Sequence, residues 1–350
     1  MRHVICCWCD TDPNRFENHV PVLFSGSRNL RLGFSNEIDL LFLSGYELLA
    51  EDYKSGLREV GYTLHDLARI YSEVESKYSG LQRFSNNAIK YFLRWLVISA
   101  YLGKEPIIHY DGDIVFNEDP VVIGKLLKGR TFVLQGCPAL TVITDQSWFS
   151  QYKDHLAVFA NDIEGYSTNA WKERVGSEIT EREKWAGRRD SEIFLHDQDF
   201  LSHLIHTDRI VQDRPSEILQ DLRSYIVFEN PLYMDGYEYN LHDVLYRRNR
   251  DIDYIDSRRV LFWHMQGYFI HYLGKYIVAK RFIPKNCITR MSNDVEKKDL
   301  YSYLYGLFCR HLRREPLYRL DVYRYFFEQN DLSEVLNNRI WWRPGVFASL

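Results

Sequence analysis

The sequence predicts an α/β fold, with a mostly parallel sheet flanked by helices and a helical region at the C-terminus. Short apolar runs bounded by Asp, Gly, Ser or Pro alternate with longer segments whose apolar residues recur every three or four positions. This alternation is typical of strand–helix–strand units with parallel strands. From about residue 275 the chain changes to long aromatic helical patterns. We therefore expect one domain over residues 1–272 and a helical region over residues 273–350.

The expected elements follow in order along the chain. Strands are predicted at residues 3–9, 38–43 and 107–110, and helices at Glu47–Val60, Leu67–Tyr78 and Asn86–Leu102. The last helix is apolar nearly all round, which indicates burial. Later predictions are a polar surface loop at 161–192, a helix from 197 to 206, β-like segments around 224–239 and 259–264, and helices at Leu300–Leu312 and Tyr318–Glu328.

Composition narrows the possible classes of protein. The net charge of −4 over 350 residues argues against a nucleic-acid-binding surface. Six cysteines without disulfide spacing indicate a reducing, cytoplasmic location. Cys6, Cys7 and Cys9 are expected to be buried thiols of the first strand rather than a metal clip, because alternation splits them between both faces. The sequence contains no apolar stretch of the length that spans a membrane.

The strongest functional signal is HYDGDIVF at residues 109–116, where a strand ends in two carboxylates separated by Gly112. Open α/β sheets bind ligands at the carboxyl ends of their strands. Asp111 and Asp113 can both reach one hard divalent cation, since the glycine permits a tight turn between them. Such a cation would neutralise a diphosphate and let it leave. The structural alternative is a β-turn rich in Asp and Gly.

Two cations interrupt the buried helix that precedes this strand. Lys90 and Arg94 are its only charged residues, and their i, i+4 spacing puts them on one stripe. Buried cations need anionic partners. They are therefore expected either to pair with carboxylates or to point toward a phosphate or the Asp pair, and Arg94 is the better candidate for the site.

Two further motifs place polar side chains at the end of a predicted helix or strand. Asp197, Gln198 and Asp199 begin a predicted helix, so that their side chains leave its N-terminus toward any cleft it faces; helix capping explains one of the acids. His264 ends an apolar strand and is followed three residues later by Gly267. It could supply a nitrogen ligand to the same cation, or be a core histidine.

In this order, the motifs resemble those of GT-A-fold glycosyltransferases, most nearly the branch of glycogenin and the bacterial lipopolysaccharide glucosyl- and galactosyltransferases. The matching residues are Arg94, Asp111-Gly112-Asp113-Ile114-Val115, Asp197-Gln198-Asp199-Phe200-Leu201 and His264-x-x-Gly267. The resemblance spans residues 3–270. One departure is Ile270, at a position where that family often has a lysine that clamps the diphosphate.

The resemblance implies a Rossmann-like GT-A sheet and transfer of a sugar from a nucleotide-diphosphate donor. Asp111, Asp113 and His264 would hold Mn²⁺ or Mg²⁺, while Lys90, Arg94 and Asp10 would belong to the donor-binding set. Asp197, Gln198 and Asp199 would face the donor sugar and the acceptor. A UDP-sugar donor and a glycan or lipid-linked acceptor in bacterial cell-surface polysaccharide or lipopolysaccharide assembly are expected on the same ground.

Two other classes of protein compete with this one. A phosphatase of the haloacid-dehalogenase type also has an apolar strand followed by Asp-x-Asp, but near its N-terminus. A non-catalytic sugar-binding protein could share the fold.

The C-terminal 76 residues carry 14 basic and 8 acidic residues, so that their net charge is +6 and that of the remaining residues is −10. With Arg310, His311, Arg313, Arg314 and Trp341-Trp342-Arg343, this region is expected either to contact a membrane from the cytoplasmic side or to pack as protein core or in a homo-oligomer.

Overall fold

A computed structural model of the protein describes residues 1–9, 16–134, 138–175, 193–226, 246–265 and 319–329, together with residues 270, 273 and 277. The chain forms two compact units, between which it passes several times. Unit 1 contains Met1–Asn14, Ser35–Gly112 and Pro120–Asp221. Unit 2 contains Arg15–Phe34, Asp113–Asp119 and Leu222–Leu350.

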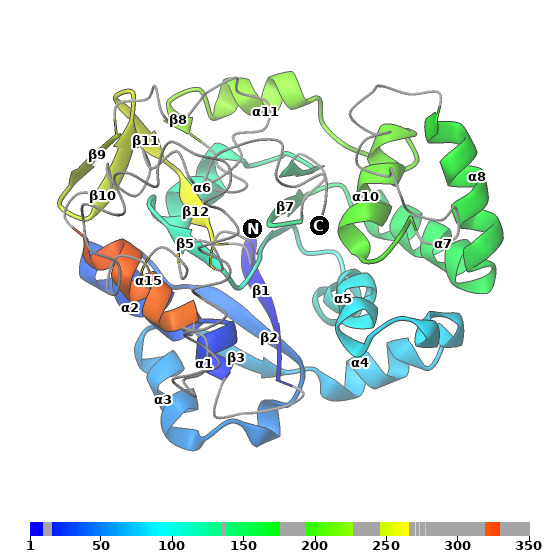
Figure 1. The fold of residues 1–350 in the computed structure, drawn as a ribbon, viewed down its shortest axis with the longest axis horizontal. Coiled ribbons are helices and arrows are strands. Elements are labelled where there is room, and N and C mark those ends of the chain that lie inside the picture. Colours follow the sequence, from blue (N-terminus) through cyan, green and yellow to red (C-terminus); the bar gives the residue numbers. More distant parts are fainter. Residues whose placement is uncertain are drawn as a thin grey trace, which may run out of the picture. The chain divides into compact units, whose positions relative to one another are not determined.

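Unit 1 is built on a six-stranded sheet with the order β3-β2-β1-β4-β7-β6 (Figure 1). Its strands are β1 (Arg2–Trp8), β2 (Ile38–Ser44), β3 (Thr63–Asp66), β4 (Ile107–Tyr110), β6 (Phe132–Val133) and β7 (Leu140–Ile143). The first four are parallel, whereas β7 pairs antiparallel with both β4 and β6. The predicted α/β class with a mostly parallel sheet is confirmed, and the predicted strands at 3–9, 38–43 and 107–110 are β1, β2 and β4.

Helices flank this sheet (Figure 1). They are η2 (Tyr46–Leu48), α3 (Glu51–Glu59), α4 (Ala68–Glu75), η3 (Ser79–Arg83), α5 (Asn86–Leu102), α6 (Pro120–Leu126), α7 (Ser147–Asn161), α8 (Ile163–Val175), α10 (Asp197–His206) and α11 (Pro215–Asp221). Helix α5 has the predicted bounds and begins where the Ser85 hydroxyl accepts the Ala88 N–H. It packs against α4, α7 and α10, and its buried Phe92 and Trp95 belong to the main core.

The loop predicted over residues 161–192 is wrong for residues 163–175, which form α8. Ile163, Ser167 and Ala170 are buried at helical spacing. Two of these three are small residues, so the buried face gave no strong apolar period in the sequence. Residues 176–192 lie outside the described residues. Cys6, Cys7 and Cys9 are buried at the end of β1, as predicted.

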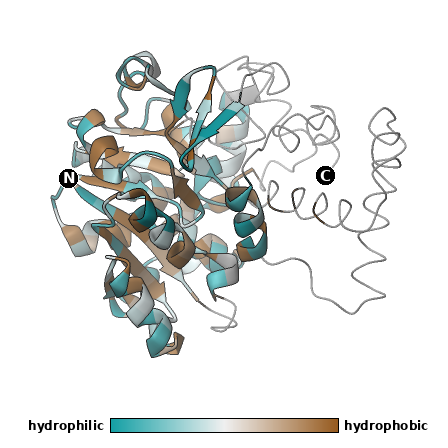
Figure 2. Cartoon of the chain, turned by 90° about the vertical axis from the view of Figure 1, so that its left-hand side faces the viewer, coloured by the Kyte–Doolittle hydropathy of each residue, from teal (hydrophilic) through white to brown (hydrophobic). Residues whose placement is uncertain are grey.

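Unit 2 contains a four-stranded sheet, β8-β11-β10-β9, and a separate antiparallel pair, β12-β5. Its strands are β5 (Ile114–Phe116), β8 (Tyr225–Ile226), β9 (Tyr246–Asn249), β10 (Ile252–Ile255), β11 (Arg258–Val260) and β12 (Phe262–His264), and its helices are α1 (Phe16–His19), α2 (Val22–Leu32) and α15 (Arg319–Glu328). The β9–β10 hairpin is coloured mostly hydrophilic in Figure 2, whereas the strands of the unit 1 sheet are largely hydrophobic.

A network of polar side chains links the two sheets of unit 2. The Asp253 carboxylate, fully buried, accepts hydrogen bonds from Tyr246, Arg248 and Trp263 at 2.6–3.0 Å. The Asn117 side chain bonds both the N–H and the carbonyl of Asp253, so it links the loop after β5 to β10. The bonds that Trp263 and Asn117 make with Asp253 are buried, and buried bonds of this kind hold the strands of unit 2 in register with the loop after β5.

Helix α15 confirms the helix predicted at Tyr318–Glu328, whereas the one predicted at Leu300–Leu312 lies outside the described residues. The same holds for Arg310, His311, Arg313, Arg314 and Trp341-Trp342-Arg343, so that membrane contact stays a prediction. Within the described part of the chain, no helix combines the length and apolar character needed to cross a membrane.

Candidate functional site

Arg94 joins two of the predicted motifs in unit 1. It lies in the third turn of α5 and donates from Nε to Asp197 Oδ2 at 2.9 Å and from Nη1 to Asp111 Oδ1 at 2.8 Å. Trp95, the next residue, donates its indole N–H to the same Asp197 oxygen at 3.0 Å. The helix cation, the first acid after β4 and the first acid of α10 therefore form one cluster.

This cluster is largely shielded from water. The side chains of Arg94 and Asp197 are each 3% exposed, while that of Asp111 is 21% exposed. Burial opposes the charge of Arg94, but the carboxylates of Asp197 and Asp111 outweigh it and hold the pKa of the guanidinium above its usual value. Burial raises the pKa of the Asp197 carboxyl, although Arg94 acts in the opposite direction. The pair is thus a fixed, tightly coupled element.

Helix α10 begins at Asp197, as predicted, with His196 as its N-cap residue. Asp197 is therefore a buried ion-pair partner in the first turn and not the cap. Asp199 is also buried and accepts the backbone N–H of Leu195 at 3.3 Å, which closes the start of the helix. Gln198 is half-buried between the two acids.

Lys90 and His109 are buried residues of unit 1. Lys90 is buried with its ammonium 5.4 Å from the centre of the Tyr71 ring, a cation–π arrangement. His109 is fully buried in β4 and donates from Nδ1 to the Pro138 carbonyl. Burial and the charge of Arg94 lower the pKa of His109 to about 3. His109 is therefore neutral at physiological pH and is a core residue beside the cluster.

Unit 2 brings Asp113 and His264 together. Strand β12 pairs with β5 so that His264 lies opposite Ile114, the residue after Asp113. His264 Nε2 is 3.2 Å from Asp113 Oδ1, and the Met265 N–H binds the Asp113 carbonyl at 2.9 Å. The strand pairing thus places a histidine predicted from a separate motif directly on the second acid of Asp111-Gly112-Asp113.

These donors fit a divalent cation. Two ligand atoms at neighbouring corners of an octahedral ion, with bonds of about 2.1 Å, lie about 3 Å apart, close to the spacing of Asp113 Oδ1 and His264 Nε2. A carboxylate oxygen suits Mg²⁺ and Mn²⁺, and an imidazole nitrogen favours a transition metal. Asp111, which ends unit 1 and is joined to Asp113 through Gly112, offers a further carboxylate of the same type.

One predicted residue is not described by the structure, and one residue that was not predicted joins these clusters. Asp10 lies outside the described residues. Ile270 is buried in the unit 2 core, so this position supplies no cation. Sequence patterns missed Arg319, whose Nη1 lies 3.4 Å from Asp113 Oδ2. Its helix was predicted, but the sequence separation of 206 between Arg319 and Asp113 leaves no local signal.

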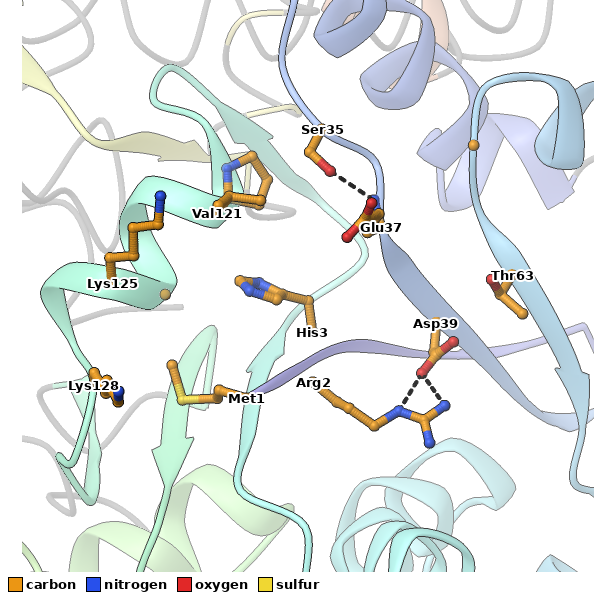
Figure 3. A pocket seen from close by; sticks show the side chains of 13 residues that line it. Met1, Arg2, His3, Ser35, Glu37, Asp39, Thr63, Val121, Lys125 and Lys128 are labelled. Carbon is orange, nitrogen blue, oxygen red and sulfur yellow. Dashed lines mark hydrogen bonds and ion pairs between the residues drawn. The ribbon is translucent and has the colours of Figure 1, made fainter.

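A pocket of about 560 Å³ also opens in unit 1, at the other end of the strands from Asp111 (Figure 3). Arg2 and His3 at the start of β1, Asp39 on β2 and Lys125 on α6 line it. Arg2 binds Asp39 at 2.6 Å, so that these two charges neutralise each other. Strand starts are not where open α/β sheets bind substrates, so this pocket is a weaker candidate.

Comparisons with known proteins add one structural likeness. No protein-family model matches the chain, and no curated protein matches it. Among solved structures, the chain is similar to the crystal structure of mouse xyloside xylosyltransferase 1 in its apo form, at 13% identity and a TM-score of 0.39. The match covers 67% of this chain and 90% of the mouse chain. At this TM-score the likeness does not by itself argue for a shared activity.

Proposed function

We propose that the protein is a metal-dependent glycosyltransferase with a GT-A-like catalytic region. The observation that supports this most is the contact of Arg94 with both Asp111 and Asp197, because it unites three of the motifs that resemble those of GT-A enzymes. The pairing of Asp113 with His264 supports it through the fourth motif. A boundary of the catalytic region near residue 272 is part of the same proposal.

Asp111, Asp113 and His264 are the proposed ligands of Mn²⁺ or Mg²⁺. When bound, the ion supplies Lewis-acid stabilisation of the leaving diphosphate. Arg94 holds the carboxylates of Asp111 and Asp197 in fixed positions. The metal ligand Asp111 is therefore already oriented before the substrate binds. Asp197 is in this proposal a positioning residue.

Asp199 and Gln198 are proposed to face the donor sugar and the acceptor. In the transfer, the bond between the anomeric carbon and the phosphate oxygen breaks, and its electron pair stays on the diphosphate. The acceptor hydroxyl loses its proton and bonds to the anomeric carbon. A carboxylate at the start of α10 either takes that proton or stabilises the positive charge that develops on the sugar.

The proposed donor is a UDP-sugar, and the proposed acceptor is a glycan or a lipid-linked glycan of a bacterial cell surface. Both follow from the resemblance of the motifs. A membrane-bound acceptor would also suit the net +6 charge of the C-terminal 76 residues, since basic residues are attracted to anionic lipid.

A panel of nucleotide sugars tests the proposal. The wild-type protein should release nucleoside diphosphate from at least one of them when Mn²⁺ is present, and much less when the ion is chelated. Asp113→Ala should keep less than about a tenth of that activity, because a ligand to the ion is lost. Glu328→Ala, which changes an exposed acid at the far end of α15, is the control and should behave as wild type.

Other outcomes would decide against it. Asp113→Ala with more than about a tenth of wild-type activity would exclude Asp113 as a ligand. Hydrolysis of phosphate monoesters without any turnover of nucleotide sugars would favour a phosphatase. Binding of sugars without turnover of either would favour a non-catalytic protein.

A further inference from the structure

Helix α15 brings a cation to the Asp113–His264 pair in unit 2. Arg319, in its first turn, has Nη1 3.4 Å from Asp113 Oδ2, while His264 lies at Oδ1 of the same carboxylate. One turn later, Tyr323 donates its hydroxyl to the backbone carbonyl of Asp113 at 3.3 Å. The helix therefore contacts residue 113 at two points, through one charged and one neutral group.

The other end of α15 is also fixed. Arg248 donates from Nη1 to the carbonyls of Phe326, Phe327 and Gln329, the orphan acceptors at the C-terminal end of the helix. The buried face of α15 packs on Phe24 of α2 and Trp263 of β12, and α15 lies beside α1 and α2 (Figure 1). The position of Arg319 is thus set by a packed helix rather than by a loop.

The contact between Arg319 and Asp113 is unlike the structural ion pair of the same unit. Arg248 and Asp253 are at most 5% exposed and lie 2.6 Å apart, whereas Arg319 is 30% exposed and stands 3.4 Å from Asp113. A tight charge-assisted bond measures about 2.7–2.9 Å. A guanidinium has five N–H groups, and the exposed part of the Arg319 side chain lets an anion reach it from the solvent side.

The positive charge around Asp113 indicates which anion Arg319 would bind. A divalent cation and the guanidinium of Arg319 would bring three positive charges to the proposed ligands Asp111 and Asp113, which carry two negative charges, so that an anion would balance the excess. A diphosphate is such an anion, and arginine is suited to phosphate because its N–H groups can bind two oxygens at once. The segment after β12 offers no substitute among its described residues, since Met265, Ile270 and Leu273 are buried and apolar.

We propose that Arg319 binds the diphosphate of the nucleotide donor, opposite the cation held by Asp113 and His264. This inference rests on the function proposed above. When the bond to the sugar breaks, the electron pair left on the phosphate oxygen increases the negative charge there. Arg319 is then best placed to stabilise the product diphosphate, and this assigns part of the donor site to the C-terminal region of the chain.

Two binding measurements test this proposal, because Arg319→Ala should weaken diphosphate binding but should not weaken the binding of Mn²⁺ alone. In the first, calorimetry measures the affinity of UDP, GDP, CDP and ADP, each with Mn²⁺, for wild type and Arg319→Ala. The nucleotide that binds wild type best should bind Arg319→Ala about 10- to 100-fold more weakly, and uridine or the matching nucleoside should show no difference. In the second, Mn²⁺ alone should bind Arg319→Ala at least as tightly as wild type, because a competing cation next to Asp113 is gone.

Two variants separate this role from folding. Arg324→Ala removes an exposed arginine from the same helix and should match wild type in both measurements. Arg319→Lys keeps the charge but not the paired N–H groups and should recover part of the diphosphate affinity. Thermal unfolding of all variants checks that α15 stays packed.

The outcomes separate the two proposals. Equal diphosphate affinity of wild type and Arg319→Ala would overturn the role of Arg319 and leave the glycosyltransferase proposal intact. Weaker binding of Mn²⁺ alone to Arg319→Ala would also overturn it, since the residue would then be supporting the metal ligands. Failure of wild type to bind any nucleoside diphosphate with Mn²⁺ would overturn the function and this inference together.

Discussion

Replacing Arg94 with methionine isolates the buried ion cluster of unit 1. Methionine keeps much of the volume and the apolar stem of arginine but removes its charge and all five donors. Asp197, 3% exposed, then keeps the Trp95 N–H and loses its counter-ion. Asp111 loses the same partner but, at 21% exposed, can still reach water.

The structure sets the size of the effect. Removing one member of a buried ion pair costs about 3–5 kcal/mol, because an uncompensated charge stays in the interior. Arg130 provides a matched comparison in the same unit, since it also binds two carboxylates, those of Glu217 and Asp221, both at 2.7 Å. Its side chain is 26% exposed, and a pair of this kind is worth about 0–1 kcal/mol. Arg94→Met should therefore be several times more destabilising than Arg130→Met.

The effect should also depend on pH. Burial already raises the pKa of Asp197, and losing Arg94 raises it further. A carboxyl whose folded pKa lies above its unfolded value favours the folded state at low pH, and that contribution is lost as the pH rises through the folded pKa. The deficit of Arg94→Met relative to wild type should thus be largest at neutral pH and shrink as the pH falls toward about 4.

Urea denaturation followed by tryptophan fluorescence measures these differences. Curves at about pH 7.5 and about pH 5 should give a smaller deficit for Arg94→Met at the lower pH. The double variant Arg94→Met/Asp197→Leu, which removes both buried charges of the pair, should be more stable than Arg94→Met alone. If Arg94→Met were no less stable than Arg130→Met, or if its deficit did not change with pH, the cluster would not be the buried charge pair described above.

Two further variants address the chemistry. His264→Ala should raise the Mn²⁺ concentration for half-maximal turnover by at least about tenfold, because a nitrogen ligand is lost; an unchanged Mn²⁺ titration would make His264 a core histidine. Asp199→Asn preserves side-chain size but removes the charge, so kcat should fall about 100-fold or more while donor binding and the melting temperature stay near wild type. A parallel loss of donor binding and stability would instead show that Asp199 only closes the start of α10.

The elements that local sequence signals define were predicted to within a few residues. Helix α5 has a capping serine at its start and Gly103 at its end, and the long apolar run between them indicates a buried helix. The β9–β10–β11 meander was only partly predicted, because its tight turns use Arg250-Asp251 and Asp256-Ser257 at positive φ instead of the Asn-Gly or Asp-Gly pairs typical of such turns. Tertiary pairing evidently overrides the local preference there.

The candidate site also has a part that could be predicted from the sequence and a part that could not. Its residue types and their positions at element ends could be read from motifs, as Asp111, Asp113 and His264 show. A carboxylate partner for Arg94 was expected, but the pairing with Asp197 could not be predicted, because Arg94 reaches Asp197 across 103 positions of sequence and nothing near either residue specifies the other. Asp253, the centre of the unit 2 network, belongs to no motif at all and was missed.

The packing of α15 has a consequence for shortening the protein. Val322, Tyr323, Phe326 and Phe327 are buried among residues of β5, β12 and α2, and each such side chain contributes about 1.5–3 kcal/mol of burial free energy. A chain cut before Arg319 would expose Trp263 to water and leave Arg248 without the helix carbonyls it binds. Residues up to Gln329 must therefore be kept in any shortened version intended for crystallisation or assay.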